Sequence, residues 1–162
     1  MTIPPLGRRR FLQGAGTAAA ASALVGGAAR AEGRSRIKIG QIGVGHAHAS
    51  KLGVYRQSAD YEVVGIVEPD AKLREKAAGQ EAYRGLPWMT RDELFATPGL
   101  QAVLVETHVR DLLDAAEASV ERGLHVHLDK PAGASLPQYA RILDAASRKG
   151  LWVQMGYMFR YN

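Results

Sequence analysis

Residues 37–50, IKIGQIGVGHAHAS, decide the fold that this sequence predicts. Its isoleucines form a short apolar strand, and Gly43-Val44-Gly45 follows at once with the first two glycines of the G-x-G-x-x-G pattern. Gly43 permits a tight turn, and Gly45 lets the backbone approach a phosphate with no Cβ in the way. The free N–H groups at the start of the following helix attract an anion. The stretch therefore predicts a loop that binds the pyrophosphate of NAD or FAD.

A second β-branched run, YEVVGIV at residues 61–67, ends at Glu68, which lies 25 residues after Gly43. A carboxylate at the end of the second strand is placed to accept hydrogen bonds from the adenosine ribose hydroxyls. It favours NAD over NADP, because a 2′-phosphate would meet a negative charge. Lys72 and Arg74 follow closely, so NADP stays open. The alternative for Glu68 is a solvated residue at a strand end.

Two His-x-His pairs raise the alternative of a metal site. His46 and His48 flank the turn, with His48 in place of the third glycine of the pattern. His125 and His127 lie on one face of a predicted strand. No acidic or cysteine ligand is spaced along the chain to complete either pair. The sequence therefore predicts no metal ligands.

The first 31 residues resemble an export signal. Residues 8–12, RRRFL, match the twin-arginine consensus, and residues 14–29 form a weakly apolar segment rich in Ala and Gly. That segment is too short and too rich in glycine for a membrane span. Residues 29–31, ARA, give the small-x-small pattern of a signal peptidase site. We expect cleavage after Ala31, and export to the periplasm through the twin-arginine (Tat) translocon.

The positive charge of the chain resides mostly in this signal. The 162 residues carry a formal charge of +5. Four of the 21 Lys and Arg residues and no acid fall within residues 1–31, so the remainder carries +1. A basic tail for nucleic acid is the alternative, but no basic patch interleaved with aromatics remains, and we expect no nucleic-acid partner. The absence of cysteine is compatible with export and with the cytoplasm alike.

Beyond the signal and a linker at residues 32–36, apolar runs alternate with helical patterns, which is typical of βαβ units. The sequence predicts an α/β fold: a doubly wound parallel Rossmann sheet over residues 37–156. Besides the two strands above, strands are predicted at residues 101–105, 124–128 and 151–155. Helices are predicted at residues 48–58, 71–78 after an Asp70 cap, 90–95 after a Thr90 capping box, 109–122 and 135–150.

Asp129-Lys130-Pro131 follows the predicted strand at residues 124–128. The carboxyl ends of parallel strands are where ligands bind in open α/β sheets, and proline fixes the path of the chain as it leaves. A lysine between an acid and a proline at this position is a candidate functional residue. The alternative is a surface lysine at a strand end.

Several segments, in this order and spacing, resemble the Gfo/Idh/MocA oxidoreductases, the family of glucose-fructose oxidoreductase and inositol dehydrogenase. They are IGVG, VVGIVEPD, DELF, AVLVET, GLHVHLDKPAG and VQMGYMFRYN. The resemblance implies a domain that binds NAD, with NADP not excluded, and a sugar or polyol substrate. The cofactor-binding residues that it implies are Gly43, Val44, Gly45, His46, Glu68, Thr107, Asp129, Lys130 and Pro131.

The resemblance implies that Lys130 is catalytic and contacts the nicotinamide end and the substrate hydroxyl, with Asp129 in place of the usual glutamate. Its ammonium would stabilise the alkoxide that develops as hydride leaves a sugar or polyol carbon. Tyr157 and Arg160 match the segment where the family's sheet passes into its second domain, so they are expected to reach toward the substrate.

Three features depart from the family's pattern. One is His48 in place of the third glycine, flanked by His46, which is placed either to crowd the pyrophosphate or to donate to it. Thr107-His108-Val109 stands where Thr-Pro-Asn is common, and Leu112 takes the place of a histidine, although Thr107 is expected to keep its backbone role. The chain ends at Asn162, where the family's substrate domain would begin, and that domain carries the second catalytic element and the oligomer interface. We therefore expect residues 157–162 to be the start of a substrate domain absent from this chain, and the full-length protein to be a homo-oligomer.

Two functions remain open on this evidence. One is an exported NAD(P)-dependent oxidoreductase of which this is the cofactor-binding half. Because twin-arginine export carries folded proteins, its cofactor would be loaded in the cytoplasm and held tightly. The alternative is a nucleotide-binding or sensor module without catalysis, which the altered loop at Thr107-His108 favours.

Overall fold

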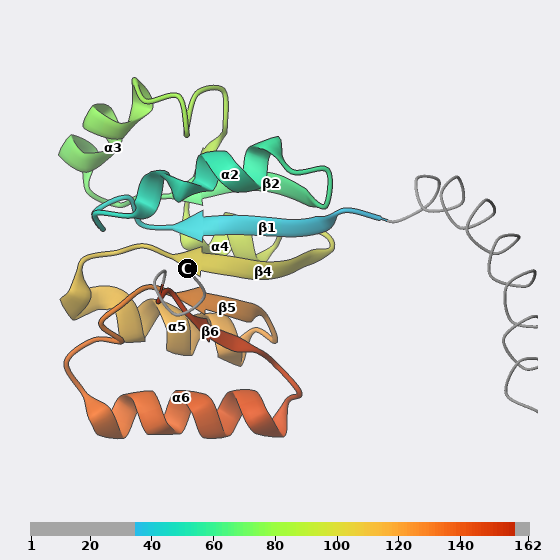
Figure 1. The fold of residues 1–162 in the computed structure, drawn as a ribbon, viewed down its shortest axis with the longest axis vertical. Helices are drawn as coiled ribbons and strands as arrows, with labels where there is room; N and C mark the ends of the chain where they lie inside the picture. The colour runs from blue at the N-terminus through green and yellow to red at the C-terminus, as the bar shows by residue number, and fades with distance from the viewer. Residues whose placement is uncertain (1–34, 158–162) are drawn as a thin grey trace, which may run out of the picture. The chain divides into compact units, whose positions relative to one another are not determined.

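The computed structural model describes residues 35–157, which form one six-stranded sheet in the order β3-β2-β1-β4-β5-β6 (Figure 1). Every neighbouring pair of strands is parallel. The chain starts in the middle at β1, extends through β2 to β3, and then crosses to β4 on the other side. The strands are β1 (Ile37–Ile42), β2 (Tyr61–Val67), β3 (Trp88–Met89), β4 (Leu100–Val105), β5 (His125–Leu128) and β6 (Val153–Met155). This topology confirms the predicted doubly wound sheet, with a switch point between β1 and β4.

Within residues 35–157, seven helical segments connect the strands. They are η1 (Ala49–Lys51), α2 (Leu52–Gln57), α3 (Ala71–Ala78), α4 (Arg91–Phe95), η2 (Val109–Asp111), α5 (Leu112–Glu121) and α6 (Leu136–Arg148). The predicted caps are confirmed: the Asp70 carboxylate accepts from the N–H of Lys72 at 2.8 Å, and Thr90 and Glu93 form a capping box. Each cap satisfies N–H groups that the first helical turn leaves free.

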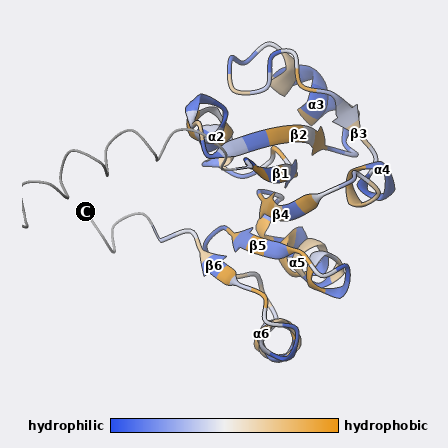
Figure 2. Ribbon diagram, turned by 90° about the vertical axis from the view of Figure 1, so that its right-hand side faces the viewer, coloured by the Kyte–Doolittle hydropathy of each residue, from blue (hydrophilic) through white to orange (hydrophobic). Residues whose placement is uncertain are grey.

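The sheet separates two hydrophobic clusters, and β4 shows the division. Val103 and Val105 belong to the larger cluster, which contains buried residues of α5 and α6, whereas Leu104 belongs to the smaller one with Leu52 of α2. Alternate residues of a strand face opposite sides, so one strand serves both. Figure 2 shows hydrophobic stretches in the strands and mixed colours around the helices. The cores hold the carboxyl ends of β1, β2, β4 and β5 at one edge of the sheet.

Two kinds of difference from the predicted elements are local. Strand β3 was not predicted, because its two residues, which pair with Ile66 and Val67, are too few to show a period. The helices predicted from residues 48 and 109 both begin with a 3-10 turn.

No helix between residues 35 and 157 is long and apolar enough to cross a membrane. The predicted signal at residues 1–31, most of the linker, and Arg160 lie outside the described residues.

Candidate cofactor and active site

The predicted glycine turn joins β1 to η1 at the switch point of the sheet. Gly43 has a φ of +90°, and a Cβ built there would lie 2.5 Å from the backbone nitrogen of Thr107. Glycine is therefore required twice at this position, by the backbone angle and by the close approach of the loop after β4. The backbone of Thr107 therefore packs directly against the turn.

Two backbone N–H groups of the turn are free to bind an anion. The N–H groups of Gly45 and Ala47 have no hydrogen-bond partner among residues 35–157. The remaining N–H groups are bonded within the protein, namely those of Gly43, Val44, His46 and His48. Unpaired N–H groups in a turn before a helical segment are ready donors to phosphate oxygens. This part of the structure fits a dinucleotide.

A cavity of 520 Å³ lies beside the turn, at the carboxyl ends of β1, β2 and β3. Its volume is within the range of small-molecule sites. Its lining is Ile42, Val67, Glu68, Pro69, Arg74, Trp88, Met89, Thr90, Arg91, Glu93, Thr107, Asp111, Asp114 and Ala115. The cavity places apolar walls and one buried carboxylate next to the glycine turn, where the adenosine half of a dinucleotide would lie.

Glu68 fixes the turn as well as lining this cavity. The side chain is buried, with 8% of the residue exposed. One carboxylate oxygen accepts from the N–H of Val44 at 2.9 Å, and the other accepts from the N–H of Asp70 at 3.0 Å. Each oxygen keeps a second lone pair, so a ribose hydroxyl can still bind. The ribose contact itself stays a prediction.

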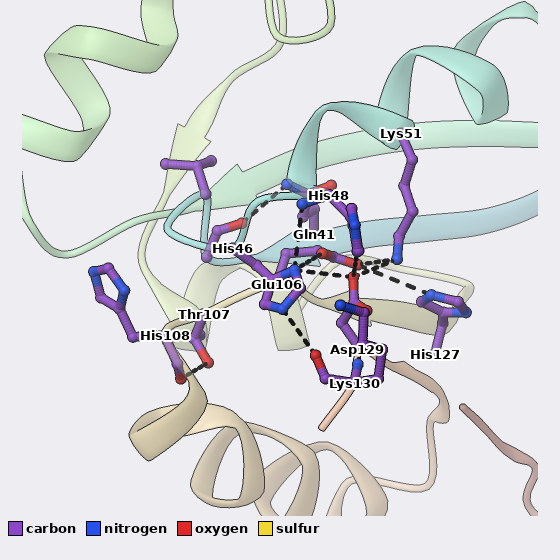
Figure 3. A network of polar contacts seen from close by, with 12 residues as sticks. Gln41, His46, His48, Lys51, Glu106, Thr107, His108, His127, Asp129 and Lys130 are labelled. Atoms are coloured by element: carbon purple, nitrogen blue, oxygen red, sulfur yellow. Dashed lines mark hydrogen bonds and ion pairs between the residues drawn. The ribbon is translucent and has the colours of Figure 1, made fainter. Parts of the chain in front are cut away.

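On the other side of the turn lies a cluster of charged and polar side chains that the sequence analysis missed as a group (Figure 3). We call it the charged cluster; its members are His46, His48, Lys51, Glu106, His127 and Asp129. Glu106 and Asp129 directly follow β4 and β5, and both are fully buried. The ammonium of Lys51 lies 2.7 Å from Glu106 Oε1 and 2.8 Å from Asp129 Oδ2. One cation therefore serves two buried carboxyl groups.

The two carboxyl groups titrate very differently. Burial raises the pKa of Glu106 to about 8, although Lys51 opposes the rise. Burial also disfavours the ionised form of Asp129, but hydrogen bonds from Lys51 and from the N–H of Lys130 outweigh it and hold the pKa of Asp129 well below its usual range. Burial, followed by the charge of Lys51, lowers the pKa of His127 to about 4. At neutral pH Glu106 is thus protonated, Asp129 ionised and His127 neutral.

The backbone of Lys130 is held from both sides by this cluster. Its N–H donates to Asp129 Oδ1 at 2.6 Å, and its carbonyl accepts from His46 Nε2 at 3.0 Å. The peptide bond to Pro131 is cis. The ammonium of Lys130 makes no hydrogen bond or ion pair with the part of the chain from residue 35 to residue 157. A positioned backbone with an uncommitted ammonium suits a residue that acts on a bound ligand.

The structure brings the predicted site residues to one edge of the sheet, in two groups. One group lies at the turn and the cavity and comprises Gly43, Val44, Gly45, Glu68 and Thr107. The other group lies at the charged cluster and comprises His46, Asp129, Lys130 and Pro131. Sequence reasoning missed Lys51 and Glu106. The available signal for Glu106 was an acid directly after a parallel strand, the same signal that singled out Glu68.

The fold and this edge of the sheet define a dinucleotide-binding domain, and comparison with known proteins gives its family. Residues 37–157 match the model of the Gfo/Idh/MocA oxidoreductase family, NAD-binding Rossmann fold. The chain belongs to this family, and its cofactor is a nicotinamide dinucleotide.

Individual relatives are distant. An uncharacterised oxidoreductase of Rhizobium meliloti is 30% identical over 129 residues, which cover 76% of this chain and 37% of the relative. A D-xylose 1-dehydrogenase (NADP⁺) of Haloferax volcanii is 26% identical over 106 residues, which cover 65% of this chain and 32% of the relative. Among solved structures, a 3-ketoreductase of Actinomadura kijaniata in complex with TDP-benzene and NADP has a TM-score of 0.67 at 22% identity. The match covers 79% of this chain and 40% of the 3-ketoreductase chain. The chain thus spans about a third of the length of these curated relatives.

Proposed function

We propose that this chain is the cofactor-binding part of an oxidoreductase that transfers hydride between NAD(H) and a hydroxyl-bearing carbon of a sugar or polyol. When bound, the cofactor supplies the hydride acceptor or donor at its nicotinamide ring. The observation that carries the proposal is the glycine turn, with two free N–H groups beside a cavity that contains Glu68. The sugar or polyol class is supported by the family and by the D-xylose dehydrogenase among the relatives.

Lys130 is the proposed catalytic residue. Asp129 and His46 hold its backbone, and its ammonium is free of partners among the described residues. In oxidation, the neutral amine of Lys130 can take the hydroxyl proton, and the resulting ammonium stabilises the alkoxide from which hydride then leaves. In reduction, the ammonium polarises the carbonyl and gives its proton to the alkoxide that hydride addition forms.

Cofactor titration of the full 162-residue chain by calorimetry tests the first part of this proposal. We expect saturable binding of NAD⁺, and weaker binding of NADP⁺ because Glu68 borders the ribose position. Gly45→Val should abolish binding, because its side chain would obstruct the approach of the pyrophosphate. Gly79→Val is the matched control, since a Cβ at Gly79 meets nothing within 4 Å. Equal NAD⁺ affinity in both variants would overturn the assignment of the turn.

We further propose export through the twin-arginine route, supported by Arg8-Arg9 before Phe11-Leu12 and by the Ala-x-Ala pattern that ends at Ala31. A reporter fused after Ala31 should reach the periplasm, and the double change Arg8→Lys, Arg9→Lys should keep it in the cytoplasm. Export that survives the double change would contradict the proposal.

A further inference from the structure

Three ligand atoms from distant parts of the chain converge in the charged cluster (Figure 3). His46 Nδ1 lies 3.1 Å from Asp129 Oδ2, and His48 Nδ1 lies 3.4 Å from the same oxygen. The ligand atoms of the three residues lie within 4.8 Å of one another. We propose that His46, His48 and Asp129 bind a divalent first-row transition-metal ion. No acid near His46 and His48 in the sequence is spaced to complete this pair; Asp129, distant in sequence, is that acid.

The hydrogen bonds of His46 fix which ring nitrogen can bind a metal. Nε2 lies 3.0 Å from the carbonyl oxygen of Lys130, which can only accept, so Nε2 carries the hydrogen. Nδ1 accepts from the backbone N–H of His48 at 3.3 Å, so Nδ1 presents its lone pair. Metal-binding histidines usually donate their other ring N–H to a carbonyl or carboxylate in this way. Nδ1 also lies 3.1 Å from Asp129 Oδ2, and two acceptors at this distance call for a cation between them; on binding, that cation would replace the His48 N–H as the partner of Nδ1.

Further buried acceptors around these residues lack partners. His48 Nδ1 and both carboxyl oxygens of Glu106 are buried without a hydrogen-bond partner among residues 35–157. Glu106 is fully buried, and its Oε2 lies 3.7 Å from His46 Nδ1. Buried polar atoms in folded proteins are rarely left unpaired without a functional reason. Of these atoms, His48 Nδ1 lies 3.4 Å from the ionised carboxylate of Asp129, and a cation bound between the two would pair both.

Lys51 is the group that competes with this ion. Its ammonium contacts Asp129 at 2.8 Å and Glu106 at 2.7 Å, the second contact lacking hydrogen-bond geometry. An ion among His46, His48 and Asp129 would take over the compensation of Asp129 and leave Lys51 to Glu106. The side chain of Lys51 is long and 22% exposed, so it can move aside. Competition between metal and ammonium for one carboxylate is therefore a direct consequence of the proposal.

The ligand set limits which ion fits. Two imidazole nitrogens and one carboxylate suit Zn²⁺, Fe²⁺ or Co²⁺, whereas Mg²⁺ and Ca²⁺ prefer oxygen ligands throughout. Three protein ligands leave a coordination position open for water or for an oxygen of a bound molecule. The His48 side chain is 24% exposed, so solvent reaches one side of the site.

Calorimetric titration of the metal-free full chain with Zn²⁺ tests the proposal independently of cofactor binding and turnover. We expect one Zn²⁺ per chain and no heat of specific binding with Mg²⁺. His48→Ala should weaken Zn²⁺ binding by more than about 100-fold, the upper end of the loss seen for residues that only support a ligand. His125→Ala is the matched control from the other His-x-His pair; its Nδ1 accepts from the N–H of Trp152 outside the cluster, so its Zn²⁺ affinity should be unchanged.

Lys51→Gln gives a second arm, because removal of the competing ammonium should tighten Zn²⁺ binding. Visible absorption of the Co²⁺-loaded chain reports the ligand field, and the His48→Ala variant should lose the intense bands of a low-coordinate site. Far-ultraviolet circular dichroism checks that each variant is folded. The proposal is overturned if the wild-type chain binds no Zn²⁺, if His48→Ala and His125→Ala bind it equally, or if Lys51→Gln weakens it.

Discussion

Two glutamates follow parallel strands in this domain, Glu68 after β2 and Glu106 after β4, and their environments are opposite. Glu68 accepts one backbone N–H on each oxygen and lines a largely apolar cavity. Glu106 has no hydrogen-bond partner among residues 35–157, and burial raises its pKa to about 8. Position at a strand end therefore does not determine what a carboxyl group does. Its hydrogen bonds do: those of Glu68 build a loop for the cofactor, whereas Glu106 belongs to a cluster with spare acceptors.

The largest effect is expected at Lys130, whose backbone is held by His46 and Asp129 of the charged cluster. In the oxidoreductase proposed above, Lys130→Ala should lower turnover by roughly two to four orders of magnitude, the range for loss of a positioned acid-base or electrostatic group. NAD⁺ affinity of the 162-residue chain should hardly change. Steady-state kinetics and calorimetry measure the two quantities. Near-full turnover in Lys130→Ala would refute its role, even with the fold intact.

A matched pair of amide substitutions sharpens the comparison of the two glutamates. In Glu68→Gln one carboxylate oxygen becomes an NH₂ group, which then faces the backbone N–H of Val44 or of Asp70. Because two donors facing each other cannot form a hydrogen bond, the free energy of unfolding should fall by about 1–3 kcal/mol. NAD⁺ affinity should fall roughly tenfold as the glycine turn loosens. Glu106→Gln replaces a protonated acid by a neutral amide. Below about pH 6.5 it should therefore lower the free energy of unfolding by less than Glu68→Gln does. Urea unfolding measures both; equal losses would show that the two environments do not differ as described.

The pH dependence of stability isolates Glu106. Its pKa rises from 4.5 in the unfolded chain to about 8 in the folded one, so the folded state binds more protons in this window and stability falls as pH rises through it. His127 acts oppositely between about 4 and 6.5, because its pKa is lowered on folding. Among the groups of residues 35–157 whose pKa is shifted, Glu106 is the one that titrates from pH 6.5 to 8.

In that window the metal-free wild-type chain should lose stability by up to about 1.4 kcal/mol per pH unit, and Glu106→Gln should remove the slope. Urea unfolding in EDTA at several pH values gives the measurement, with Glu62→Gln as the control, since that carboxyl group lies on the surface. Parallel slopes in the wild type and in Glu106→Gln would show that Glu106 is not the titrating group.

The sequence was informative where neighbouring residues carry the signal. The strand, glycine turn and Glu68 lie within one βαβ unit, and the caps at Asp70 and Thr90 are local motifs, so their roles in the fold could be predicted. The charged cluster could not, because His46 and Asp129 meet only once β1 and β5 are ordered around β4. Lys51 gave no pattern at all, since a single lysine near a helix start is ordinarily solvated. β3 escaped because two residues carry no period.

The central claim is that the cofactor binds at the glycine turn on the Glu68 side, and amide chemical shifts during NAD⁺ titration test it most directly. The signals of Gly45 and Ala47, whose N–H groups are unbonded among the described residues, should move saturably with NAD⁺. Those of Gly123 and Gly150, which precede β5 and β6 at the opposite edge of the sheet, should stay in place. Unmoved Gly45 and Ala47 signals at saturating NAD⁺, with shifts at Gly123 and Gly150 instead, would contradict the account.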